Sequence, residues 1–183
     1  MHKLAIVVIL AIILGCEKES IPKPKAYLSL EYPKQTYREL EVKRPYRFEV
    51  GKNTIVKELP NDWLKIEYPD LKASVDITYR PVDNNLRELF LEAEKLVTEH
   101  SIKADYFNWI DFSSTEARVF GKLVKIEGNA ASQVQFHATD STRNFIKGSL
   151  FFYAKPNYDS IYPAVEYIKK DMERMMESLE WQN

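Results

Sequence analysis

The chain has 183 residues, of which 45% are hydrophobic and 13% aromatic, enough to bury the core of one domain. Acidic and basic side chains nearly balance, giving a formal net charge of −1. This near-neutral charge gives no electrostatic reason to expect nucleic-acid binding, which needs a concentrated basic surface. The single cysteine excludes an intramolecular disulfide and a zinc site built from several thiolates.

The N-terminus has the pattern of a bacterial export signal. Lys3 precedes an unbroken apolar run over residues 4–14, which would span roughly 16 Å as a helix. That length is too short for a bilayer core of roughly 30 Å and is typical of a signal-peptide core. Gly15 and Cys16 follow directly, and this ending resembles the bacterial lipobox. We therefore predict a signal peptide over residues 1–15 and lipidation of Cys16, whose acyl chains would anchor the protein to a membrane.

A polar segment follows the cysteine. Residues 17–26 read EKESIPKPKA, with Pro22 and Pro24 alternating with lysines. Prolines at this spacing favour an extended, solvated backbone. We expect residues 16–26 to form a lipidated, semi-rigid tether and residues 27–183 to form a single globular domain.

The first part of the domain alternates apolar and polar residues in short runs, most clearly at Ala73, Val75, Ile77 and Tyr79. Such alternation predicts half-buried strands, here over residues 27–32, 46–50, 63–68 and 73–79. Asn84 or Asn85 then provides a helix cap. An apolar stripe at three- and four-residue steps predicts an amphipathic helix that ends near residue 103.

The second part has three further strand candidates, over residues 115–127, 132–139 and 145–154, joined as an antiparallel meander. Asn157 or Asp159 would cap a last amphipathic helix, with Pro163 tolerated in its first turn. Together these elements predict an α+β domain in which an antiparallel sheet packs with two amphipathic helices. The element order and the ending over residues 148–179 are similar to a PsbP-like α-β-α sandwich.

Catalytic chemistry has little support in the sequence. His100 lies at a predicted helix end, where histidine usually has a structural role. His137 lies in a predicted strand near Asp140, but no nucleophile elbow, phosphate-binding glycine loop or HExxH helix accompanies it. We therefore predict a protein that is not an enzyme, with no catalytic, cofactor-binding or metal-binding residues and no cofactor.

Aromatic residues gather between the first helix and the strand over 115–127, at Tyr106, Phe107, Trp109 and Phe112. A second group occupies residues 151–153. One interpretation is that these rings cover the sheet and fill the core. The other is that some of them form a partner-binding patch.

The hairpin over residues 128–142 is rich in small and polar residues. This content exceeds what core packing requires, so we predict that Asn129, Gln133 and Gln135 contact a partner. The alternative is a solvated hairpin without a binding role.

Several long segments together resemble one known family. They are PKPKAYLSLEYP, ITYRPVDNNL, GNAASQVQFHATDST and GSLFFYAKPNYDS, over residues 22–33, 77–86, 128–142 and 148–160. In this order, and with the lipobox, they are similar to the GldD family of gliding motility lipoproteins of the Bacteroidota. The resemblance implies a cell-envelope lipoprotein required for gliding motility and for type IX secretion, with other envelope proteins of these systems as partners. Only Cys16 carries over as a functional residue.

Two questions remain open at this stage. Glu17 follows the lipidated cysteine, in place of the aspartate that retains lipoproteins in the inner membrane of enteric bacteria. This favours the outer membrane. The fold likeness also leaves room for a different role, an envelope module that binds a small molecule or a glycan in a cleft.

Overall fold

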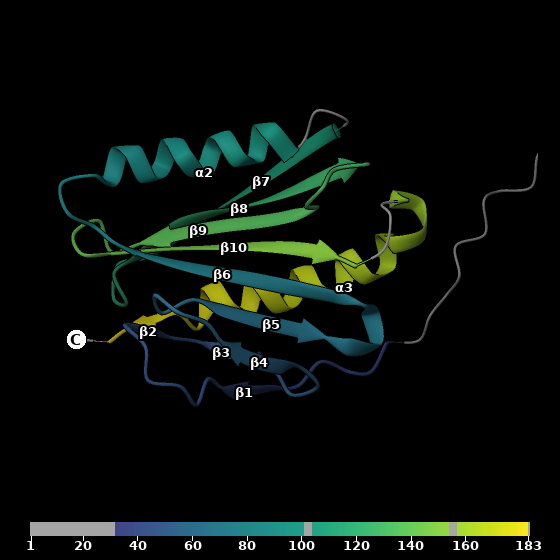
Figure 1. The fold of residues 1–183 in the computed structure, drawn as a ribbon, viewed down its shortest axis with the longest axis horizontal. Helices are drawn as coiled ribbons and strands as arrows, with labels where there is room; N and C mark the ends of the chain where they lie inside the picture. The colour runs from purple at the N-terminus through teal and green to yellow at the C-terminus, as the bar shows by residue number, and fades with distance from the viewer. Residues whose placement is uncertain (1–31, 101–103, 154–156, 183) are drawn as a thin grey trace, which may run out of the picture.

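The computed structural model describes residues 32–100, 104–153 and 157–182. Its centre is a seven-stranded antiparallel sheet in the order β4-β5-β6-β10-β9-β8-β7. Figure 1 shows this sheet with β7 near one border and β4 near the other. The strands are β4 (Ile55–Glu58), β5 (Leu64–Tyr68), β6 (Ala73–Pro81), β7 (Ala104–Ser114), β8 (Val119–Gly128), β9 (Val134–Thr139) and β10 (Asn144–Phe152).

The two long helices cover opposite faces of the sheet. Phe145 of β10 packs with Leu89 and Ala93 of α2 (Leu86–His100). The next residue, Ile146, belongs to the main core with Ile168 of α3 (Tyr158–Glu177). Because successive side chains of a strand point to opposite faces, the domain is layered as helix, sheet and helix. The α+β class and the antiparallel sheet with two helices are confirmed.

Short strands extend the α3 side of the domain. β1 (Tyr37–Glu39) pairs with β3 (Glu49–Gly51), and β2 (Tyr46–Arg47) pairs with β11 (Glu180–Trp181). A 3-10 turn, η1 (Pro69–Leu71), joins β5 to β6. The main core lies between the sheet and α3, and the smaller clusters lie under α2.

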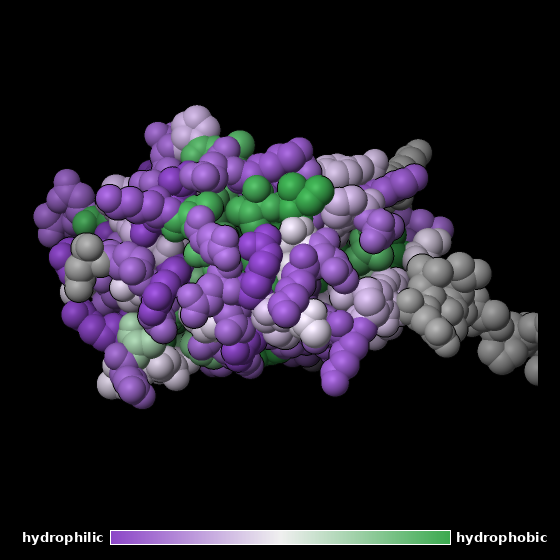
Figure 2. Space-filling model, turned by 90° about the horizontal axis from the view of Figure 1, so that it is seen from below, coloured by the Kyte–Doolittle hydropathy of each residue, from purple (hydrophilic) through white to green (hydrophobic). Residues whose placement is uncertain are grey.

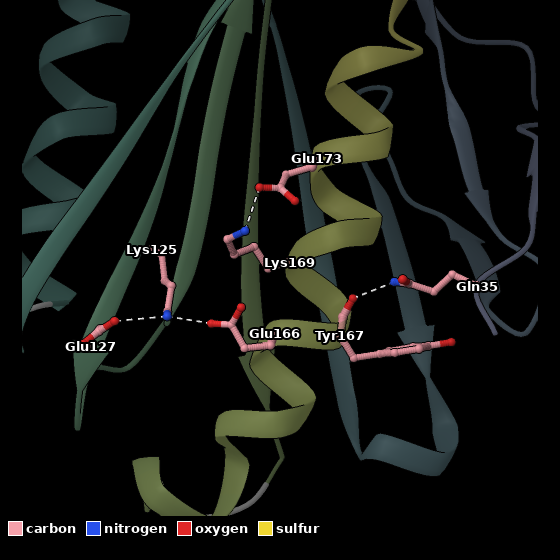
Figure 3. Close-up of polar contacts among 7 residues, drawn as sticks. All are labelled: Gln35, Lys125, Glu127, Glu166, Tyr167, Lys169 and Glu173. Carbon is pink, nitrogen blue, oxygen red and sulfur yellow. Dashed lines mark hydrogen bonds and ion pairs between the residues drawn. The ribbon is translucent and has the colours of Figure 1, made fainter. Parts of the chain in front are cut away.

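An ion-pair network centred on the buried Lys125 fastens α3 to the sheet. Lys125 of β8 lies 2.6 Å from Glu166 of α3 and 3.0 Å from Glu127. Its ammonium also lies 4.9 Å from the ring centre of Tyr162. Figure 3 shows Lys125 between the two carboxylates, with a separate pair, Lys169 and Glu173, one turn further along α3. Burial lowers the pKa of Lys125, but the two carboxylates outweigh it and raise the pKa.

Most predicted elements are present, and the differences are local. The strand expected over 46–50 is divided into β2 and β3, and the strand expected over 115–127 begins only at Val119. The aromatic segment that precedes it is not a connection but the strand β7. Pro163 lies inside α3 and not in its first turn, because the helix already begins at Tyr158. Most of the strand expected over 27–32 lies outside the described residues.

Candidate functional site

A groove of about 840 Å³ lies at one end of the sheet. This volume is in the range of ligand pockets, roughly 300–1,000 Å³. Segments far apart in the sequence meet there: the 40–47 segment, the end of β6, the start of β10 and the C-terminal residues (Figure 1). Its apolar lining residues are Leu40, Val42, Pro45, Pro81 and Val82.

The charged lining of the groove is mainly basic. Lys43, Arg44, Arg47 and Arg143 contribute to it, against Asp62 alone among acidic lining residues. Arg44 lies 2.7 Å from Glu58, outside the lining, and 3.8 Å from Asp62. The groove therefore combines an apolar surface with a basic rim, which suits a segment that carries both apolar and acidic groups.

Ion pairs and hydrogen bonds hold the 40–47 wall in place. Arg47 donates from Nε to Glu180 at 2.9 Å, which ties β2 to β11 beyond their backbone pairing. Tyr46, a fully buried core residue, donates its hydroxyl to the Asp62 carbonyl at 2.6 Å. The wall is thus fixed to both the C-terminus and the β4–β5 turn.

The opposite wall is shaped by a turn built on Asp140. Its Oδ1 accepts hydrogen bonds from the backbone amides of Thr142, Arg143 and Asn144, at 2.8–2.9 Å. Burial raises the pKa of Asp140, but these hydrogen bonds outweigh it and lower the pKa to about 2. Asn144 in turn accepts a hydrogen bond of 2.8 Å from the Tyr79 hydroxyl. This chain of contacts fixes Arg143, Asn144 and Tyr79, which line the groove.

The three residues predicted to contact a partner lie outside this groove. Asn129 is exposed, and its side chain accepts a hydrogen bond of 3.1 Å from the backbone amide of Tyr158. Gln133 and Gln135 are only 1% and 2% exposed. Gln133 donates to the Ala130 carbonyl within the hairpin loop, and Gln135 belongs to β9. Of the three, only Asn129 is accessible to a partner in this conformation.

His137 lies among aromatic side chains. The His137 ring is stacked on Phe145 and meets the edge of Phe90, at centre distances of 6.0 and 5.3 Å. Burial, with a smaller effect of Lys122, lowers the pKa of His137 to about 4. The nearby Asp140 carboxylate is engaged by its own turn. His100 is the last residue of α2.

The aromatic residues of β7 divide between the two interpretations. Phe107 and Phe112 are half-buried and pack against core clusters. Tyr106 and Trp109 are 61% and 45% exposed. The other edge strand, β4, also has an exposed apolar side chain, since Ile55 is 50% exposed. Figure 2, which views the molecule from below Figure 1, shows apolar residues gathered in one stretch within a mainly hydrophilic surface.

Among the described residues, no three His, Cys, Asp or Glu side chains are grouped so that they would hold a metal ion. Within those ranges, neither helix is long and apolar enough to cross a membrane. The predicted signal peptide, Cys16 and the tether over 16–26 lie outside them.

Sequence patterns gave no indication of the groove, because its walls come from separate segments whose contact depends on the sheet order. The comparison with curated proteins found no match. A family model described as gliding motility lipoprotein GldD matches residues 17–181, nearly the whole chain after Cys16. The chain therefore belongs to the GldD family of gliding motility lipoproteins.

Proposed function

We propose that this lipoprotein is anchored in the cell envelope through Cys16 and supports gliding motility and type IX secretion as a non-catalytic assembly component. The observation that carries this proposal is the family match over residues 17–181, directly after the lipobox-like ending at Cys16. We place the anchor in the outer membrane, because Glu17 and not aspartate follows the cysteine. The protein would act by holding other envelope proteins in place.

The groove at the sheet end supports a docking role. Its walls are held by hydrogen bonds and ion pairs within the domain, so little ordering cost opposes binding. Lys43 is exposed on the rim and has no ion-pair partner among the described residues. We propose that the groove receives an extended segment of an envelope protein that carries apolar and acidic residues.

The surroundings of two residues suited to chemistry, His137 and Asp140, support the proposed non-catalytic role. His137 lies between aromatic rings, and Asp140 is saturated by amide donors. Neither is placed to activate a nucleophile in the way that acyl or phosphoryl transfer requires.

The experiment that tests this role replaces the gene in a gliding host with the Cys16→Ala variant. Metabolic labelling with a fatty acid measures acylation, colony spreading measures gliding, and culture supernatants measure type IX secretion. We expect the variant to lose the label and both activities while the domain remains folded. A variant that lacks the label but still glides and secretes normally would contradict an anchored role.

A further inference from the structure

Helix α3 buries a carboxylate that has no counter-charge among the described residues. Asp171 is 2% exposed, and its Oδ1 accepts a hydrogen bond of 2.7 Å from Gln35. The nearby arginine of the helix, Arg174, is paired with Glu49 at 2.6 Å. Buried charges are normally paired or bound to cations, because an isolated buried charge costs several kcal/mol. Asp171 is therefore an unusual residue for a purely structural position.

A cavity of about 60 Å³ lies beside this carboxylate. Its lining comes from the 32–36 segment without Lys34, the 51–54 turn, residues 68–71, and two residues of α3. The lining includes two further charged residues, Lys52 and Asp70, and both are exposed. One water molecule requires roughly 10–15 Å³ by this measure. The space therefore accepts a small polar group with a short stem, beyond a single water.

Aromatic rings form much of the cavity wall. The rings of Tyr32 and Tyr167 are stacked with their centres 5.0 Å apart. Gln35 fixes this wall by a second hydrogen bond, of 2.8 Å, to the Tyr167 carbonyl (Figure 3). The faces of tyrosine rings attract cations through the ring quadrupole.

The hydroxyl of Tyr68 is a second unusual group in the cavity. Tyr68 is 5% exposed, and its buried hydroxyl makes no hydrogen bond of acceptable geometry with a described residue. Burial and then the nearby Asp171 charge raise the pKa of this phenol. Buried hydroxyls normally have a partner, and the polar group that this phenol lies against is the Asp171 carboxylate.

The residue opposite Asp171 has no side chain. A Cβ atom added to Gly51 would lie 3.0 Å from Asp171 Oδ2, so an alanine there would press against the carboxylate. Oδ2 therefore lies against the Gly51 backbone, and the hydroxyls of Tyr37 and Tyr68 also lie near the carboxylate.

From this arrangement we propose that the cavity binds a primary ammonium group, with the Asp171 carboxylate as counter-ion and tyrosine rings as walls. An ammonium group matches both features, since it neutralises the charge through charge-assisted hydrogen bonds and interacts with aromatic faces. A neutral hydroxylated ligand would leave the carboxylate charge uncompensated. The ammonium would come from a free small amine or from an ethanolamine phospholipid headgroup. This inference is independent of partner docking in the groove.

Thermal unfolding of the full lipoprotein in neutral detergent tests the proposal. Ethylammonium chloride is titrated against sodium chloride at equal ionic strength, because a ligand of the native state raises the unfolding midpoint. Asp171→Asn keeps the Oδ1 acceptor for Gln35 but removes the charge, and Asp111→Asn on the exposed part of β7 is the matched control.

We expect ethylammonium to raise the midpoint of the wild type and of Asp111→Asn. The apparent affinity should fall about tenfold or more in Asp171→Asn, since the charge-assisted contact is lost. Equal midpoint shifts in the wild type and Asp171→Asn would overturn the proposal, as would the absence of any shift with either ammonium source.

A second arm separates the two sources. The wild type and Asp171→Asn are reconstituted into phosphatidylglycerol vesicles with and without phosphatidylethanolamine. A higher midpoint with phosphatidylethanolamine, seen in the wild type only, supports the headgroup as ligand. A response of the wild type to ethylammonium but not to the headgroup supports a free amine.

Discussion

Asp140 Oδ2 accepts a hydrogen bond of 2.8 Å from the side-chain amide of Asn144. The other oxygen of the same carboxylate accepts the backbone amides of the turn. Asn144 continues the network to the Tyr79 hydroxyl. A single aspartate thus determines the shape of the β9–β10 turn and one wall of the groove.

Replacing this aspartate tests its role in the turn. Asp140→Ala leaves several buried donors without an acceptor, and hydrogen bonds to charged groups contribute about 1.5–3 kcal/mol. We expect the free energy of unfolding at pH 7 to fall by about 2–3 kcal/mol, measured by urea denaturation. The pKa is lowered from 3.8 to about 2, so the stabilisation is present above pH 3.8 and is lost as the pH falls through 2. A pH-independent difference between the wild type and Asp140→Ala would contradict this.

His137 makes the stability depend on pH in a higher range. Its pKa is lowered from 6.5 to about 4, so the unfolded chain binds more protons between these values. The stabilisation from neutral His137 is present above pH 6.5 and is lost as the pH falls toward 4, by about 2–3 kcal/mol. His137→Phe should remove this part of the pH dependence, as measured by unfolding at several pH values. The same slope in wild type and variant would show that another group is responsible.

Lys125 is expected to stabilise the attachment of α3 to the sheet only while its carboxylates are present. Lys125→Met leaves Glu166 and Glu127 close together without a cation. We expect a loss of about 1–2 kcal/mol of unfolding free energy, because the two carboxylates that lose their cation are partly screened by solvent. The double variant Lys125→Met and Glu166→Gln should regain part of this loss, and a double-mutant cycle measures the coupling. Additive effects would show that the two groups do not interact.

Asp171 should have the opposite effect on the pH dependence of stability to that of Asp140 and His137. Its pKa is raised, chiefly by burial, although Tyr68, Gln35 and Tyr37 lower it in part. The folded state therefore favours the protonated acid, and this contribution is lost as the pH rises through the raised pKa. We expect Asp171→Asn to unfold at a higher urea concentration than the wild type at pH 7, with the difference disappearing below about pH 3.9. A destabilised variant at pH 7 would assign Asp171 a structural role.

Much of the fold follows from sequence periodicity, and the β7 segment shows where that signal fails. β7 has apolar side chains for both faces: Phe107 packs toward the α2 cluster, whereas Ile110 and Phe112 pack toward the main core. A register shift near Ala104 and Tyr106 disturbs the pattern further. The period-two alternation that reveals a half-buried strand is therefore absent there.

The candidate site was less predictable for a related reason. The polar character of Gln133 and Gln135 indicated a surface, but Gln135 lies in β9, a central strand covered on both faces. Gln133 is buried in the loop that precedes this strand. Sequence patterns report which residues share a face and not which strands lie between others. For the same reason, no local motif joins Lys43 to Tyr79 and Arg143, which meet only in the folded groove.

Co-purification from gently solubilised membranes tests the central claim, that this anchored protein docks an envelope partner in its groove. The tagged wild type is compared with Lys43→Glu and Arg143→Glu combined, and with Lys95→Glu on exposed α2 as the control. We predict that gliding or type IX secretion proteins copurify with the wild type and the control, and that the groove variant loses them while remaining folded and membrane-bound. The same partners recovered with the groove variant at wild-type levels would contradict the account.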